Sequence, residues 1–173
     1  LVRNEIILKE TIQLFKKFRD NNLDNIVLYE NFGTLILTGC CLGCFSSGDI
    51  DIFAYETDKS KIELTFLSLG YYKTVKKNVD DTIVSIYSNK NLIENEIFNV
   101  NIAWRIVTRK YISSLELIQR RTEHLLKETV VLENGIRVFN REAMLYTNLL
   151  HISLGHYYTT SPGIRLYYDI DSI

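Results

Sequence analysis

The chain has 173 residues, of which 46% are hydrophobic and 24% are charged, a composition typical of a globular protein with one domain, or one domain and a small addition. Its formal net charge is only −1, so no overall positive charge attracts nucleic acid, and an enzyme that grips long nucleic acid is disfavoured. No apolar run reaches the roughly 18 residues that a membrane-spanning helix needs, and the first residues lack the apolar stretch of a secretion signal, so we expect a cytoplasmic protein without a membrane partner.

The first third of the chain is predicted to alternate helices and strands. Apolar side chains recur at helical spacing over residues 3–21, which predicts a helix that covers one face of a sheet. The apolar segment 34–39 predicts a buried strand. A short helix from Cys40 is then expected to lead back to a second strand that carries Asp49.

The middle of the chain shows one more helix and three extended segments. Ser60 and Glu63 have the spacing of a capping box, which predicts the start of a helix. Residues 71–76 and 82–87 flank a polar turn and are predicted to form a β-hairpin. Residues 97–104 predict a further strand with one apolar side and one unusually polar side.

Beyond residue 110 the pattern becomes mainly helical. We expect a helix over 114–127, an extended piece over 135–139 and a helix capped by Asn140. Ser-Pro-Gly at 161–163 is expected to break the chain before a last helix.

The order of these elements predicts an α+β fold in two parts. We assign residues 1–110 to a core with a mixed β-sheet flanked by helices, and residues 111–173 to a mainly helical C-terminal part. The absence of an initiator Met and the abrupt end at Ile173 suggest an excised portion of a longer protein. A missing C-terminal part could contribute to substrate binding.

The most informative segment, 46–53, reads Ser-Ser-Gly-Asp-Ile-Asp-Ile-Phe. Side chains alternate along a strand, so Asp49 and Asp51 share one face while the two isoleucines share the other. Carboxylates one strand step apart repel each other, and burying an unpaired charge is costly, so a cation is expected beside them. Hard oxygen ligands favour Mg²⁺ or Mn²⁺, and two ions about 3.5–4 Å apart would support in-line phosphoryl transfer.

Small residues precede the two aspartates and predict a phosphate-binding turn. Their backbone amides are accessible to phosphate oxygens, and Ser47 could also donate its hydroxyl. The plainer interpretation is a solvated surface strand beside a turn, with Ser47 bonded to its own backbone. The residues of this turn are Gly39, Gly43, Ser46, Ser47 and Gly48.

Together these segments resemble the signature of the nucleotidyltransferase superfamily, the fold shared by polymerase-β-like enzymes and antibiotic nucleotidyltransferases. In that signature a glycine and a small residue close one strand, and a short helix and loop lead to Asp-hydrophobic-Asp-hydrophobic. Here Gly39 and Cys40 match the first part, with Cys40 where Gly or Ser is usual, and residues 49–52 match the second. The later stretches 100–105 and 149–170 look like the bacterial branch labelled uncharacterised nucleotidyltransferase.

The resemblance implies a nucleotidyltransferase-like mixed β-sheet and a metal-dependent reaction. A nucleoside monophosphate would pass from a nucleoside triphosphate to a hydroxyl of an unidentified small molecule or protein, with release of pyrophosphate. Asp49 and Asp51 would hold Mg²⁺ or Mn²⁺ and act in catalysis. The phosphate site would comprise Gly39, Cys40, Ser47 and Gly48.

Family members normally place a third carboxylate on a neighbouring strand, where it binds metal and takes the proton of the acceptor. The matching position here is Asn101, whose amide is uncharged and a very poor base. Three explanations stay open. Glu94, Glu96 or Asp81 could supply the carboxylate; the chain could be a catalytically impaired, nucleotide-binding regulator or antitoxin-like module; or the substitution could have been introduced to trap a complex.

Other reactive or charged side chains have plainer explanations. Cys41 and Cys44 have the spacing of a redox pair or half a zinc site, but no second pair completes it, so we expect reduced cysteines that fill space beside the turn. Arg105, Arg109 and Lys110 follow the Asn101 strand and could meet triphosphate charge. The plainer interpretation, which we favour, is that these basic side chains are only solvated, as is more common for basic residues after a strand.

Overall fold

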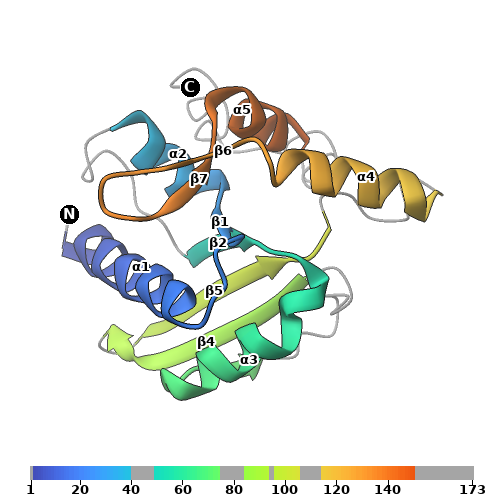
Figure 1. The fold of residues 1–173 in the computed structure, drawn as a ribbon. Coiled ribbons are helices and arrows are strands. Elements are labelled where there is room, and N and C mark those ends of the chain that lie inside the picture. Colours follow the sequence, from blue (N-terminus) through green and yellow to red (C-terminus); the bar gives the residue numbers. More distant parts are fainter. Residues whose placement is uncertain (1, 40–48, 75–83, 94–95, 106–113, 151–173) are drawn as a thin grey trace, which may run out of the picture.

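The computed structural model describes residues 2–39, 49–74, 84–93, 96–105 and 114–150 (Figure 1). Its strands form one seven-stranded mixed sheet in the order β3-β4-β5-β2-β1-β7-β6. In chain order the elements are α1 (Val2–Asp20), β1 (Val27–Leu28), α2 (Glu30–Thr38), β2 (Asp49–Phe53), the 3₁₀ helix η1 (Glu56–Asp58), α3 (Lys59–Ser68), β3 (Tyr72–Thr74), β4 (Val84–Ile93), β5 (Glu96–Ala103), α4 (Leu115–Leu125), β6 (Thr129–Val131), β7 (Arg137–Phe139) and α5 (Arg141–Leu150).

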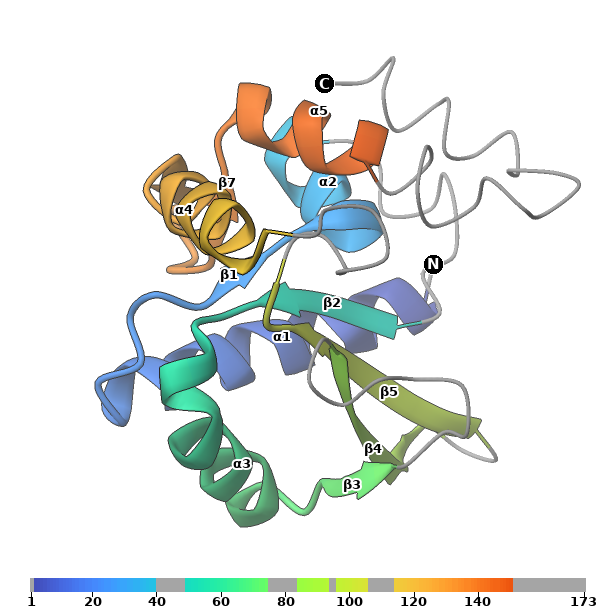
Figure 2. The same cartoon turned by 90° about the vertical axis from the view of Figure 1, so that its right-hand side faces the viewer.

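Strand β2 lies near the middle of the sheet, between β5 and β1. It runs parallel to β5 and antiparallel to β1, while β3, β4 and β5 form an antiparallel meander. In Figure 2, β2 and β5 lie side by side, with α1 behind β2. This order confirms the expected α+β architecture, with a mixed sheet flanked by helices.

Helices α1 and α3 cover one face of the central strands. Phe66 of α3 stacks on Tyr87 of β4, with 4.4 Å between ring centroids, and packs edge-to-face against Phe18 of α1. Tyr87 is paired with Val100 of β5, which is paired in turn with Ile50 of β2, so these side chains share a face. All five are buried and belong to the hydrophobic core.

A second packing layer joins α2 and α5 to the short strands β1 and β7. A Cβ atom on Gly33 would lie 3.1 Å from the backbone of Leu28 and 3.1 Å from Met144 Cε, so a side chain there would require these neighbours to move by a few tenths of an ångström. Asn148 Nδ2 of α5 donates to Thr34 Oγ1 of α2 over 3.0 Å, and both residues are buried. Helix α2 is thereby held between the sheet and α5.

Most predicted elements in the described ranges are confirmed. The expected helix over 3–21 is α1, the hairpin corresponds to β3 and β4, and the strand over 97–104 is β5. Ser114 and Asn140 cap their helices by accepting the backbone N–H groups of Leu117 and Ala143.

Two local predictions were wrong, and one strand was not foreseen. Residues 34–38 form the second half of helix α2, and Gly39, with φ of 67°, ends this helix in the left-handed conformation. The strand that precedes the helix is the two-residue β1. A short apolar run does not distinguish a buried strand from a buried helix. Ser60 lies inside α3, which begins at Lys59, and β6 was not foreseen.

Several expectations fall outside the described residues: the short helix after Cys40, the turn of the hairpin and the last helix. The division at residue 110 stays a prediction, and β6 and β7 from beyond that point join the same sheet as the core strands. Among the described residues, no helix is long and apolar enough to cross a membrane.

Candidate functional site

Asp49 and Asp51 lie on the face of β2 opposite to its isoleucines. Ile50 and Ile52 are fully buried against the core, whereas Asp49 is half-buried and Asp51 is 8% exposed. The strand alternation expected from the sequence is therefore present. The parallel register with β5 places Asn101 beside Asp51 on the same side of the sheet.

The Asn101 side chain bridges the two carboxylates. Its Nδ2 atom donates to Asp49 Oδ2 over 2.7 Å and to Asp51 Oδ1 over 2.9 Å. Hydrogen bonds to charged acceptors are shorter and stronger than those between neutral groups. The amide therefore reduces the repulsion that the adjacent carboxylates would otherwise suffer, and it holds them side by side.

Neutral polar side chains continue this face toward the edge of the sheet. Asn99 is paired with Asp49 across β5 and β2, and its Oδ1 atom accepts from Ser88 Oγ over 2.7 Å. The hydroxyl of Thr74 lies 2.6 Å from Ser88 Oγ. The polar side of β5 was visible in the sequence, but its continuation onto β4 and β3 was not, because strand register depends on distant pairing.

Tyr29 joins the site from the end of β1. Its backbone N–H donates to the carbonyl of Asp51 over 3.0 Å. Burial raises the pKa of Tyr29 well above its usual range, and the nearby carboxylates of Glu30, Asp51 and Asp49 raise the pKa further. A tyrosine hydroxyl is neutral at physiological pH even at its ordinary pKa, so this rise only reinforces its capacity to act as a hydrogen-bond donor.

Neither Tyr29 nor Glu30, which follows it at the start of α2, was identified as a neighbour of the aspartates from the sequence. Glu30 begins α2 with φ of 54°, a left-handed conformation that is costly for a residue with a side chain. Strained backbone of this kind is concentrated at functional sites. A glycine or asparagine would have signalled the turn, but glutamate gives no such signal.

The predicted phosphate turn lies mostly outside the described residues. Cys40, Ser47 and Gly48 are not described, and the same holds for the CxxC cysteines and for Glu94 and Asp81. Gly39 is described: it is exposed at the end of α2. The assignment of these residues to phosphate binding stays a prediction.

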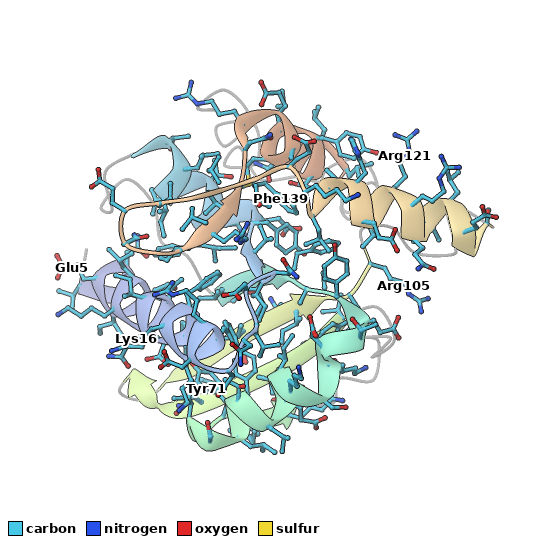
Figure 3. The ribbon with its side chains drawn as sticks, in the orientation of Figure 1. Glu5, Lys16, Tyr71, Arg105, Arg121 and Phe139 are labelled. Atoms are coloured by element: carbon cyan, nitrogen blue, oxygen red, sulfur yellow. The ribbon has the colours of Figure 1, made fainter. Side chains whose placement is uncertain are left out.

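Arg105 lies at the other end of the central strands. Its Nη2 atom is 2.8 Å from Glu56 Oε2, and this ion pair is partly exposed to solvent. The pair borders a cavity of about 260 Å³ between the C-terminal ends of β2 and β5 and helix α4, and Figure 3 shows Arg105 at the edge of the molecule. The guanidinium is therefore engaged away from the aspartates, while Arg109 and Lys110 lie outside the described residues.

The donor set fits a divalent cation bound by few protein ligands. Because one amide nitrogen reaches both carboxylates, Asp49 and Asp51 are close enough to contact the same ion. Mg²⁺ often takes one or two carboxylates and completes its shell with water and substrate phosphates. Within the described ranges no group of three or more His, Cys, Asp or Glu side chains could hold a metal.

Comparison with known proteins agrees with this architecture. A family model described as "Uncharacterised nucleotidyltransferase" matches residues 1–173, and no curated protein sequence matches significantly. The solution structure of the antibiotic-resistance factor ANT(2'')-Ia, described as revealing substrate-regulated conformation dynamics, is similar with a TM-score of 0.53. The likeness covers 95% of this chain and 82% of that chain at 11% sequence identity, so it concerns the fold alone.

Proposed function

Since the chain belongs to the family of uncharacterised nucleotidyltransferases, we propose that it binds a nucleoside triphosphate with Mg²⁺ or Mn²⁺ at Asp49 and Asp51. The nucleoside monophosphate is transferred to a hydroxyl of a small molecule or a protein. The observation that carries the proposal is the pair of carboxylates on the polar face of β2, held together by Asn101.

In the proposed reaction the acceptor oxygen attacks the α-phosphorus of the nucleotide. The bond from that phosphorus to the oxygen that bridges it to the β-phosphorus breaks, pyrophosphate leaves with the electron pair, and the acceptor hydroxyl gives its proton to solvent water. A bound divalent cation supplies charge neutralisation and orientation for the phosphates. Asp49 and Asp51 hold that cation, while Gly39, Cys40, Ser47 and Gly48 cradle the phosphate oxygens.

Asn101 also favours a second candidate function. An amide that donates to both carboxylates is in no position to take a proton from the acceptor. A nucleotide-binding regulator or antitoxin-like module would keep affinity for the nucleotide and the cation and carry out little chemistry. The two candidates share the binding site and differ in pyrophosphate release.

The test measures binding and chemistry together. Each of the four common nucleoside triphosphates is added with Mg²⁺, and we record the dissociation constant by calorimetry and the pyrophosphate released. The variant Asp51→Asn is expected to weaken nucleotide binding at least tenfold, whereas Asp24→Asn, the same change at an exposed position, should have no effect.

Binding with pyrophosphate release identifies the transferase, and any nucleotide label that moves onto the protein itself reveals a protein acceptor. Binding without release identifies the regulator. Equal affinity of the wild-type protein and Asp51→Asn for every nucleotide, or no binding at all, would contradict both.

A further inference from the structure

The polar face of the sheet continues from the aspartates into a row of uncharged side chains. Strand pairing places Asn99 beside Asp49 and Ser88 beside Asn99. Tyr72 of β3 is in turn paired with Ser88, and residues directly opposite each other share a face of the sheet. Resting on the proposed function, we infer that this row binds the acceptor substrate, and that this substrate is a neutral compound with several hydroxyl groups, such as a sugar.

A chain of hydrogen bonds orients the Asn99 amide. Ser88 Oγ donates its single proton to Asn99 Oδ1 over 2.7 Å. The hydroxyl of Thr74, which lies 2.6 Å from Ser88 Oγ, therefore donates to Ser88. Both N–H groups of Asn99 Nδ2 remain for a ligand, because no acceptor for them occurs in the part of the chain that the structure describes. Thr74 and Ser88 are thus positioning residues, and Asn99 presents the hydrogen-bond donor.

The spacing of the row suits a compact ring with adjacent hydroxyl groups. The backbone of Asn99 is one strand spacing, about 4.8 Å, from that of Asp49. One hydroxyl of such a ring can face the aspartates while the next accepts a hydrogen bond from Asn99 Nδ2. Tyr72 ends the row with 39% of its surface exposed, and its ring adds an apolar surface for the carbon skeleton of the ligand.

The lack of charge in the row favours a neutral ligand. Asn99, Ser88 and Tyr72 are uncharged side chains, and the carboxylates of Asp49 and Asp51 are engaged with the cation in the proposed complex. An ammonium or carboxylate group bound along the row would lose water without gaining an opposite charge, which is costly. Hydroxyl groups lose less, because the amide and hydroxyls of the row replace their bonds to water.

The place of the row in the sheet favours the acceptor substrate over the triphosphate. The predicted phosphate turn begins at Gly39, at the end of α2, and α2 packs against β1 and β7. In the sheet order these strands lie on one side of β2, whereas β5, β4 and β3 lie on the other (Figure 2). A nucleotide whose phosphates lie toward α2 leaves the β5 side of the aspartates for the second reactant.

The test compares probes that share a ring and differ in charge. Glucose, galactose and mannose, each with its amino sugar and its uronic acid, are titrated calorimetrically into the chain saturated with Mg²⁺ and a non-hydrolysable nucleoside triphosphate analogue. At least one neutral hexose should bind roughly tenfold more tightly than both of its charged forms. Asn99→Ala should weaken that binding by roughly tenfold, the loss of about one hydrogen bond, and leave the affinity for the analogue unchanged. Asn25→Ala, the same change at an exposed position, should alter neither.

Several outcomes would overturn the inference and leave the proposed function intact. They are tighter binding of the charged sugars, no binding of any neutral hexose, and unchanged hexose affinity in a folded Asn99→Ala variant. Weaker binding of the analogue to Asn99→Ala with unchanged hexose binding would assign the row to the ribose of the nucleotide instead.

If Asn99→Ala does not fold, Thr74→Val removes the first donor of the chain and keeps the shape of the side chain. This variant should weaken hexose binding, and an unchanged affinity would again overturn the inference. The proposed function fails separately, if the analogue does not bind to the wild-type protein or binds equally well to Asp51→Asn.

Discussion

Asn101 reverses the chemical role that a carboxylate would have at the same place. It donates hydrogen bonds to Asp49 and Asp51, whereas a carboxylate at that place could accept a proton. Its two hydrogen bonds hold the aspartates side by side, so a nucleotide bound as proposed would meet carboxylates that are already positioned. Order of this kind lowers the entropy cost of binding but adds nothing to proton transfer.

Placing a carboxylate at position 101 should therefore raise the rate of the chemical step. If the chain is a transferase, Asn101→Asp is expected to raise the rate of pyrophosphate release by roughly 100-fold or more, the usual contribution of a positioned general base. The rate should become independent of pH above the pKa of the new carboxylate, whereas the wild-type rate should keep rising as the acceptor ionises. Discontinuous or coupled assays of pyrophosphate release over a range of pH measure both the rate and its pH dependence.

Thermal unfolding provides the control for that experiment, because a third carboxylate beside two others destabilises the site unless metal is present. The variant should therefore be stabilised by Mn²⁺ more than the wild-type protein is. An unchanged rate in a folded variant would refute the account in which a base has been lost.

At the scale of whole elements, the junction of α1 with the strand β3 contains a buried acid. The hydroxyl of Tyr71, which follows α3 and precedes β3, donates to Glu10 Oε1 of α1 over 2.8 Å. Figure 3 shows Tyr71 close to α1. Burial raises the pKa of Glu10 above its ordinary value of 4.5, and the hydrogen bond from Tyr71 offsets only part of that rise.

This raised pKa predicts the pH dependence of stability. The folded protein holds the Glu10 proton more tightly than the unfolded chain does, so the stabilisation is complete below pH 4.5 and is lost as pH rises through the raised pKa. In Glu10→Gln the amide oxygen can still accept from Tyr71, and this part of the pH dependence should disappear.

Denaturant unfolding from pH 4 to pH 8 measures the effect. Glu5→Gln, on the exposed side of the same helix, should keep the wild-type profile. A free energy of unfolding that rises above pH 4.5 in the wild-type protein but not in Glu10→Gln would contradict the assignment. Identical pH profiles for Glu10→Gln and Glu5→Gln would also contradict it.

At the scale of the molecule, the two faces of the sheet have different compositions. Over the central strands, one face is closed by α1 and α3, whose aromatic side chains pack on Tyr87 and on the branched side chains of β2 and β5. The other carries the aspartates, Asn101 and the neutral polar groups of β4 and β5. The apolar face supplies the stability that allows two like charges to be held together on the opposite face.

Removing an aromatic ring from the apolar face should destabilise the whole domain. Phe66 is fully buried where α3, α1 and β4 meet, and Phe66→Ala is expected to lower the free energy of unfolding by about 3–5 kcal/mol. The adjacent Leu67 is 53% exposed, so Leu67→Ala should change it by no more than about 0.5 kcal/mol. Urea denaturation compares the two, and similar losses would show that the core is placed elsewhere.

The sequence predicted best where the signal was local. Alternation along 49–53 assigned the faces of β2, and apolar spacing located α1 and α3. It failed at α2, where a short apolar segment suits either a helix or a strand, and at β6, which is three residues long and exists by pairing with β7. The contact of Tyr29 with Asp51 escaped notice because the two residues are distant in the chain.

The sequence by itself determined that two aspartates share one side of a strand, because alternation is a property of the extended backbone. Only the tertiary structure decided what they meet, since the parallel pairing of β2 with β5 brings Asn101 to Asp51 across 50 residues of chain. That pairing depends on which strands become neighbours when α1 and α3 bury the apolar face, and no local pattern encodes it. The bridging amide is therefore a result of the fold.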